Sequence, residues 1–221
     1  MEKKIPQIES RLRHNILEIP TAAYKASGIL IYGKRIKTLV FTTDIAIIRN
    51  CDADAVLAVY PFTPQQIIAD SIIKAADMPV FCGVGGGTTN GMRTVNLAKD
   101  AEHSGAMGVV MNAPITNDNI RMVYDEIDAP IVITVANENT DIAARLEAGA
   151  SILNVACGKD TPKVVRKIRQ QFPDVPIMAS GGNSDELIAE TIAAGANAIT
   201  YTPPTTNEMF KKLMVKYREN S

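Results

Sequence analysis

The chain has 221 residues, of which 46% are hydrophobic and 21% are charged, and its formal net charge is −1. This composition predicts one soluble globular domain with a large core, and the near-zero charge argues against nonspecific nucleic-acid binding. No apolar run is long enough to span a bilayer and the start Met-Glu-Lys-Lys-Ile-Pro lacks the apolar core of a signal peptide, so we expect a cytoplasmic protein without a membrane partner.

The sequence pattern of residues 1–37 predicts a helix followed by a hairpin. Apolar residues recur at helical spacing over residues 5–17, and Pro6 suits the start of a helix. Gly33-Lys34 then separates two short apolar runs, as the turn of a hairpin does. We expect this N-terminal helix and hairpin to close the bottom of the domain that follows.

From residue 38 to residue 221, short apolar strands alternate with amphipathic helices. Strands are predicted at 38–43, 55–60, 79–82, 108–112, 130–135, 151–156, 176–179 and 197–202. Helices are predicted at 44–51, 63–76, 91–104, 117–127, 140–148, 162–172, 184–194 and 207–219. Nearly all-apolar strands are typical of buried parallel sheets. Eight strands alternating with eight helices predict an α/β fold, a single-domain (β/α)8 TIM barrel with an N-terminal capping helix.

An internal repeat supports the barrel. The third, fifth and seventh predicted strands each follow an Asp-X-Pro sequence, at residues 77–79, 128–130 and 174–176. The fourth, sixth and eighth each follow a Gly-Ala pair. The repeating unit is therefore two strand–helix modules, roughly 44–51 residues long. Odd and even strands fill different layers of a barrel interior, so this period fits the fold.

The stretch from Pro176 to Thr206 carries the strongest functional signal. It reads as a strand, a Ser-Gly-Gly turn, a helix, a Gly-Ala stop and a last strand. Backbone N–H groups at such a turn can approach an anion closely. The alternative is that the glycines only form a tight turn. The predicted phosphate-binding residues here are Ser180, Gly181, Gly182, Asn183, Thr202 and Thr205.

This unit resembles the seventh and eighth units of the ribulose-phosphate-binding barrel superfamily. That superfamily includes ribulose-phosphate epimerases, the histidine and tryptophan biosynthetic isomerases, and 2-keto-3-deoxy-gluconate aldolases. The resemblance covers the chain from the first barrel strand as architecture and residues 177–202 as a motif. It implies a small phosphorylated substrate and a homo-oligomer. The chain departs from the family at Thr202-Pro203-Pro204, because prolines supply no N–H donors to a phosphate.

Polar residues at other strand ends extend the predicted site, because active sites of this fold lie where strands end and helices begin. Asn112, Asn137 and Asn154 are amides that need partners near an apolar barrel mouth, and a bound carbonyl or hydroxyl would supply them. The glycine-rich loop 83–91, with Gly85 and Gly86, has three interpretations: a mobile lid, a second anion site, or a flexible connection.

Three charged residues are candidates for acid–base chemistry. Asp44 and Glu138 follow the first and fifth strands, and the histidine-pathway isomerase resembles this in having acids there. Asp44 equally suits the N-cap of the first helix, and Glu138 equally suits a solvent-facing loop. Lys159 follows the sixth strand, near the place where related aldolases carry a Schiff-base lysine, but a solvated or phosphate-contacting lysine also fits.

Neither a metal site nor a disulfide framework is expected. The chain has only two histidines and three widely spaced cysteines, so neither a His-rich metal site nor a disulfide framework is predicted. Cys157 lies at a strand end, where a nucleophile and a small buried residue are both consistent with its position.

These observations predict a metal-independent enzyme acting on a small phosphorylated metabolite, as an isomerase, an epimerase or an aldolase-type lyase. No cofactor is expected. The alternatives are a hydrolase of a small ester or phosphate, an FMN-binding oxidoreductase, and a barrel that binds a metabolite without turnover.

Overall fold

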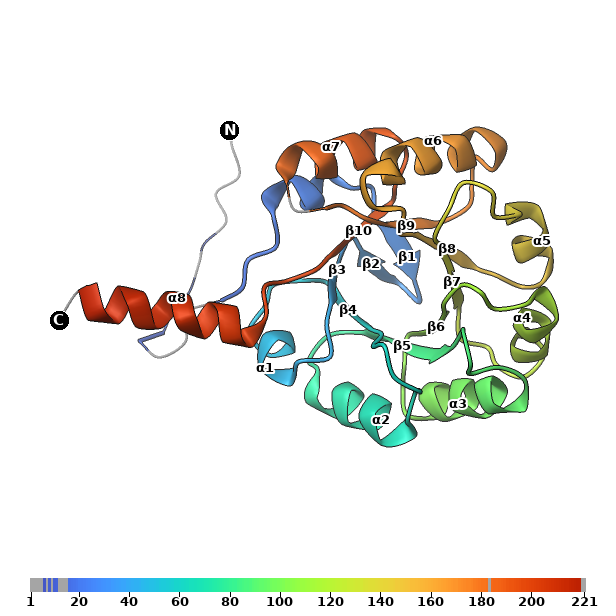
Figure 1. Cartoon of the computed structure of the whole chain (residues 1–221), viewed down its shortest axis with the longest axis horizontal. Coiled ribbons are helices and arrows are strands. Elements are labelled where there is room, and N and C mark those ends of the chain that lie inside the picture. The colour runs from blue at the N-terminus through green and yellow to red at the C-terminus, as the bar shows by residue number, and fades with distance from the viewer. Residues whose placement is uncertain (1–5, 7, 9, 12–15, 183, 220–221) are drawn as a thin grey trace.

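The computed structural model describes residues 6, 8, 10, 11, 16–182 and 184–219. Its centre is a closed barrel of eight parallel strands in the order β10-β3-β4-β5-β6-β7-β8-β9 (Figure 1). The predicted TIM barrel is therefore confirmed. The strands are β3 (Thr38–Phe41), β4 (Ala55–Ala58), β5 (Val80–Gly85), β6 (Gly108–Met111), β7 (Ile131–Val135), β8 (Ile152–Val155), β9 (Ile177–Ser180) and β10 (Ala198–Tyr201).

Each barrel strand is followed by a helix, and helices α1 to α7 lie around the barrel in Figure 1. They are α1 (Ile45–Ile48), α2 (Gln66–Ala75), α3 (Met92–His103), α4 (Asn117–Tyr124), α5 (Ile142–Glu147), α6 (Thr161–Gln171) and α7 (Asp185–Ala193); the last helix is α8 (Thr206–Glu219), and a 3-10 turn, η2 (Gly158–Asp160), precedes α6. Among the described residues, no helix is long and apolar enough to cross a membrane.

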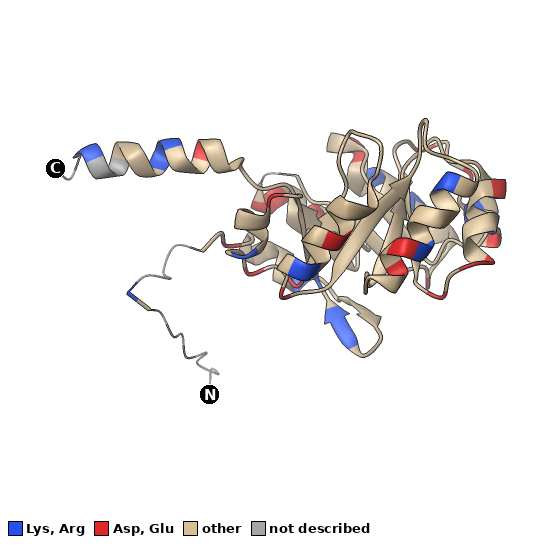
Figure 2. Cartoon of the chain, turned by 90° about the horizontal axis from the view of Figure 1, so that it is seen from below, with Lys and Arg blue, Asp and Glu red and all other residues tan. Residues whose placement is uncertain are grey.

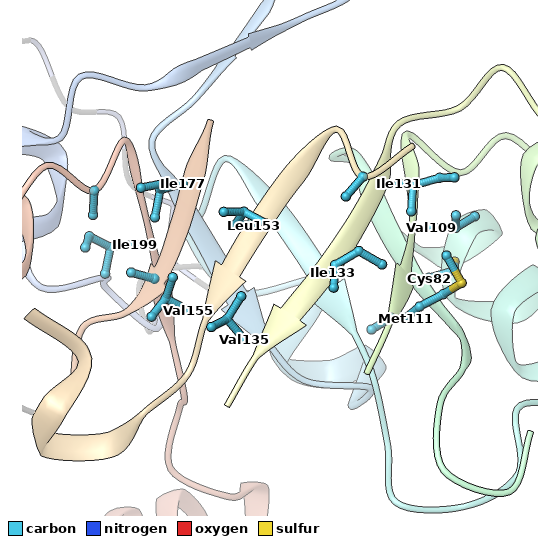
Figure 3. Packing of buried hydrophobic residues seen from close by; sticks show 14 of the residues in the cluster. Cys82, Val109, Met111, Ile131, Ile133, Val135, Leu153, Val155, Ile177 and Ile199 are labelled. Atoms are coloured by element: carbon cyan, nitrogen blue, oxygen red, sulfur yellow. The ribbon is translucent and has the colours of Figure 1, made fainter. Parts of the chain in front are cut away.

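Alternation of side chains along the strands produces two apolar layers. Outward-facing residues such as Ile133, Leu153 and Ile199 (Figure 3) belong to one cluster with buried residues of the surrounding helices. Inward-facing residues fill the barrel itself, where they form a second cluster. The inner cluster contains Leu39, Ala55, Leu57, Phe81, Val110, Val132, Ile152, Met178 and Ala198.

A hairpin covers the end of the barrel at which the strands begin. Strands β1 (Ile29–Ile31) and β2 (Lys34–Ile36) pair in antiparallel fashion around the turn at residues 32–33. The side chains of Ile29, Ile31 and Ile36 are buried in the same cluster as the barrel interior. The helix predicted over residues 5–17 lies largely outside the described residues.

Helix α8 extends away from the barrel in both views (Figures 1 and 2), instead of packing beside α7 as the last helix of a regular barrel would. The 3-10 helix η1 (Thr21–Lys25) packs beside α7 there, and Ala22 and Ala23 are buried in the outer core. Met209 packs against that core, but Phe210 is 63% exposed and Val215 is 52% exposed. Part of the apolar surface of α8 is thus left facing solvent.

Candidate active site

A cavity of about 660 Å³ opens at the end of the barrel at which the strands terminate. Its polar lining results from the same alternation of inward- and outward-facing side chains along the strands that forms the core. Ile152 faces inward on β8, so Asn154, two residues later, also faces inward, one layer higher. The lining consists of hydroxyls, amides and apolar groups: Phe41, Thr42, Thr43, Leu57, Val59, Tyr60, Pro61, Asn112, Thr134, Asn154, Ala156, Ser180, Thr200 and Thr202.

Two polar side chains of this mouth cavity are buried without partners. Asn154 and Thr200 are each 6% exposed, and within the described residues neither Asn154 Oδ1 nor Thr200 Oγ1 has a hydrogen-bond partner. Two other polar residues of the cavity wall are paired with each other: Thr134 Oγ1 donates a hydrogen bond to Asn112 Oδ1 at 2.8 Å. Buried polar atoms are rarely left unpaired in folded proteins. Two residues of the cavity wall therefore carry an unpaired side-chain oxygen among the described residues.

A second cavity of about 520 Å³ adjoins the first beneath the glycine-rich loop, with Val59, Tyr60, Pro61 and Asn112 lining both. Gly85 and Gly86 line this side cavity, as do Gly87 and Thr88.

The loop itself forms a tight turn. The N–H of Gly86 donates to the carbonyl of Thr89 at 2.9 Å, and the N–H of Thr89 donates back at 3.3 Å. The buried Asn119 then anchors the end of the loop by accepting from the Gly91 N–H at 2.8 Å. The loop is thus a hydrogen-bonded part of the wall.

The Ser-Gly-Gly turn has a packing explanation. A Cβ atom on Gly181 would lie 2.7 Å from Ile199 Cγ2, and the Gly181 N–H donates weakly, at 3.4 Å, to the carbonyl of Thr200. Gly182 has a φ of +70°, and a Cβ there would collide with Leu187. Neither glycine lines the mouth cavity, whereas Ser180 and Thr202 do. Asn183 lies outside the described residues.

Two other predicted site residues stabilise helix ends. Asp44 caps α1 by accepting from the N–H groups of Ala46 and Ile47, at 2.8 and 3.3 Å, and it also accepts from the Thr206 hydroxyl. Thr205 forms a capping box at the start of α8, because its N–H and hydroxyl both donate to Glu208 and its Oγ1 accepts from the Glu208 N–H. Neither residue lines the mouth or side cavity.

The candidates after the fifth and sixth strands are exposed, and Asn137 and Glu138 line a separate cavity of about 310 Å³ between α5 and α6. Glu138 Oε2 pairs with Lys163 Nζ at 2.8 Å, and this partner lowers the pKa of the Glu138 carboxyl below its ordinary value. Asn137 is exposed and accepts from the Asn139 N–H at 3.0 Å, which closes a local turn. Lys159 is exposed in η2. None of the three lines the mouth or side cavity.

The surroundings of Cys157 favour a neutral thiol. Its Sγ lies 3.4 Å from the carbonyl oxygen of Val135, and burial together with the charge of Asp160 raises the pKa of the thiol. In the described part of the chain, no group of three or more His, Cys, Asp or Glu side chains is placed to hold a metal ion.

Tyr60 is a residue of the site to which the sequence reasoning assigned no role. In the sequence it is the last residue of the strand predicted at 55–60. The structure places it at the junction of the two cavities, where it is half-buried. Its hydroxyl accepts from the Gln65 N–H at 2.8 Å. Thr134 and Thr200 were missed as well, because both lie inside predicted strands, although period-two alternation from Val132 and Ala198 places them inward.

Comparisons with known proteins agree on the fold. No family model matches the chain. A 4-hydroxy-tetrahydrodipicolinate synthase from Chlorobium chlorochromatii (strain CaD3) is 25% identical over 151 residues, which are 61% of this chain and 50% of that protein. The chain thus matches about half the length of this curated relative.

Among solved structures, a putative phosphonomutase from Burkholderia cenocepacia J2315 superposes with a TM-score of 0.64 at 17% identity, over 83% of this chain and 92% of that one. A phosphoenolpyruvate phosphomutase from Streptomyces platensis subsp. rosaceus has a TM-score of 0.64 at 14% identity, over 89% and 83% of the two chains. These likenesses establish the TIM barrel. The resemblance to ribulose-phosphate-binding barrels stays a prediction.

Proposed function

We propose that the protein is an enzyme of the isomerase, mutase or lyase type that binds a small carbonyl-containing metabolite in the mouth cavity. The observation that carries this proposal is the pair of buried, unpartnered oxygens on Asn154 and Thr200. Burying a polar group without a hydrogen bond is costly, so a bound ligand that pairs with both groups recovers that energy. The names of the relatives support the reaction class.

The chemistry of the lining defines what the site can do. Among the described residues, those that line the mouth cavity include no lysine, arginine, aspartate or glutamate. The inward positions on β8, the sixth barrel strand, are Ile152 and Asn154, so this strand presents no lysine for a Schiff base. Reaction in this cavity therefore relies on preorganised neutral donors, which stabilise charge well when water is excluded.

The second part of the proposal is that the substrate carries a phosphate group. The hydroxyls of Ser180 and Thr202 line the cavity at the ends of β9 and β10, where the sequence motif places a phosphate. Packing accounts for both glycines, and the weak Gly181 hydrogen bond to Thr200 leaves that N–H only partly satisfied. We therefore propose that side-chain hydroxyls supply most of the contacts to the phosphate.

A thermal-shift panel tests the proposal. The compounds are dihydroxyacetone phosphate, ribulose 5-phosphate, phosphoenolpyruvate and pyruvate, each at a concentration far above micromolar affinity. A ligand at one hundred times its Kd stabilises a protein by about 2.7 kcal/mol, which corresponds to a rise of roughly 5–11 °C in Tm for a chain of this size. Binding by no compound in the panel would refute the proposed function.

Matched variants locate the site. Thr200→Val is nearly isosteric and removes the unpartnered hydroxyl, so we expect it to abolish the ligand-induced shift. Glu138→Gln alters an exposed ion pair outside both cavities and serves as the control. An equal loss in both variants would show that the shift does not report binding at the barrel mouth.

We also propose that the protein forms a homo-oligomer in which α8 contributes to the contact. The exposed Phe210 and Val215 on a helix that stands away from the barrel support this. Light scattering of the full chain and of a Phe210→Ser, Val215→Ser variant measures the molar mass. We expect the variant to have a smaller mass, and equal masses would contradict a role of α8.

A further inference from the structure

We propose that Tyr60 is a catalytic residue of the mouth site, donating a hydrogen bond from its hydroxyl to the substrate oxygen on which negative charge develops. This assignment rests on the proposed function. Its starting point is that Tyr60 lines both the mouth cavity and the side cavity. A ligand that occupies either cavity, or extends across their junction, therefore meets this side chain.

Tyr60 differs in chemistry from everything else in these walls. Among the described residues, it is the one ionisable side chain that lines either cavity. The other polar neighbours are alkyl hydroxyls and amides, including Thr200 and Asn154. A phenol is a stronger acid than either group, and its hydrogen bond strengthens more as negative charge accumulates on the acceptor.

The phenol is held in place by the backbone. Tyr60 Oη accepts a hydrogen bond from the Gln65 N–H at 2.8 Å, and Gln65 is the residue that precedes the first turn of α2. Because this bond occupies a lone pair of the oxygen, the phenolic hydrogen stays available to a ligand. A hydrogen bond accepted by an oxygen also polarises its own O–H and makes it a better donor. The Gln65 N–H therefore positions Tyr60 and strengthens its hydrogen bond.

This donor fits the reaction type proposed for the site. Isomerases and lyases that act beside a carbonyl pass through states in which the carbonyl oxygen carries negative charge. None of the described residues that line the cavity carries a positive charge to balance it, so the strongest neutral donor contributes most to stabilising the oxygen. The proton that leaves the substrate carbon passes to solvent water at the open mouth of the cavity. Tyr60 keeps its own proton and stabilises the oxygen by a hydrogen bond.

The first test measures exchange of substrate C–H protons with D2O by proton NMR, using the full chain and the four compounds of the thermal-shift panel. Loss of one such donor lowers turnover by about 100- to 1000-fold. We expect Tyr60→Phe to lower kcat by this factor and to change KM by less than about threefold, because the ring that fills the wall remains. The matched control is Tyr201→Phe, since Tyr201 is also half-buried but packs against the outer core.

A purely structural role for Tyr60 gives a different result. In that case Tyr60→Phe removes the acceptor of the Gln65 N–H and lowers Tm by about 2–4 °C, but it does not lower kcat selectively. Retention of more than one tenth of wild-type kcat by a folded Tyr60→Phe variant would overturn the assignment.

Fluorine NMR provides a readout that does not depend on turnover. The protein is labelled with 3-fluorotyrosine, and the resonance of Tyr60 among the six tyrosines is identified by its absence in Tyr60→Phe. We expect any panel compound that raises Tm to shift this resonance. A compound that binds without shifting it would overturn the role of Tyr60 and leave the proposed binding site intact. Binding with a shift but without exchange would refute the enzymatic function and retain Tyr60 as a ligand contact. Binding by no compound would refute both.

Discussion

Replacing Asn154 by leucine, a residue of similar size, should stabilise the protein while abolishing ligand binding. Asn154 is only 6% exposed, and its Oδ1 has no hydrogen-bond partner among the described residues. A buried polar group left unpaired costs about 1–3 kcal/mol. Asn154→Leu removes this cost, so we expect the free energy of unfolding to rise by about 1–3 kcal/mol. For a chain of this size that corresponds to an increase in Tm of roughly 2–12 °C.

Asn119 provides the matched control. It is 3% exposed, but its Oδ1 accepts from the Gly91 N–H at 2.8 Å and its Nδ2 donates to the Gly91 carbonyl at 3.4 Å. Asn119→Leu leaves both backbone groups without these partners, so the same substitution should lower stability by about 1–3 kcal/mol. Urea denaturation followed by circular dichroism gives both values. If Asn154→Leu destabilises the protein as much as Asn119→Leu does, then Asn154 is not an unpaired group and the reasoning behind the site is wrong.

The remaining predictions concern residues outside the mouth cavity. Glu138→Gln should leave the turnover of any panel substrate within about twofold of wild type, because neither partner of its exposed ion pair with Lys163 lines the mouth or side cavity. A loss of tenfold or more in steady-state assays would restore Glu138 as a catalytic candidate. Burial raises the pKa of Cys82 to about 12, so its thiol stays protonated and unreactive at pH 8. Mass spectrometry after iodoacetamide treatment should find Cys82 modified only once urea unfolds the protein, and rapid labelling of the folded chain would contradict the buried position.

Much of the fold could be predicted because local chemistry and global packing agree. The eight barrel strands begin and end within a few residues of their predicted positions, since strands buried on both faces are short and nearly all apolar. Helix starts are encoded as clearly: Thr116, Asp141 and Ser184 each cap the helix that follows by accepting a backbone N–H. These signals act over a few residues, so a sequence shows them directly.

The site was only partly predictable, because its residues come from different strands and loops. Asn154 was identified from its place near a strand end, and alternation from Ile152 explains why it faces the cavity. Glu138 and Lys159 follow strands just as directly, yet both are exposed and neither lines the mouth cavity. The direction of a loop side chain depends on the turn it occupies and on its neighbours, and neither is periodic.

By itself, the sequence determined the barrel, the order of its elements and the absence of charge from the strand interiors, because hydrophobic period, caps and repeats are local patterns. Only the tertiary structure showed that the glycines of the Ser-Gly-Gly turn serve packing, that Asp44 joins the starts of α1 and α8, and that Tyr60 lies between two cavities. Each of these facts depends on contacts between segments far apart in the chain. Such contacts are decided by how the whole barrel closes. In the closed barrel, Asn154 Oδ1 and Thr200 Oγ1 have no hydrogen-bond partner among the described residues.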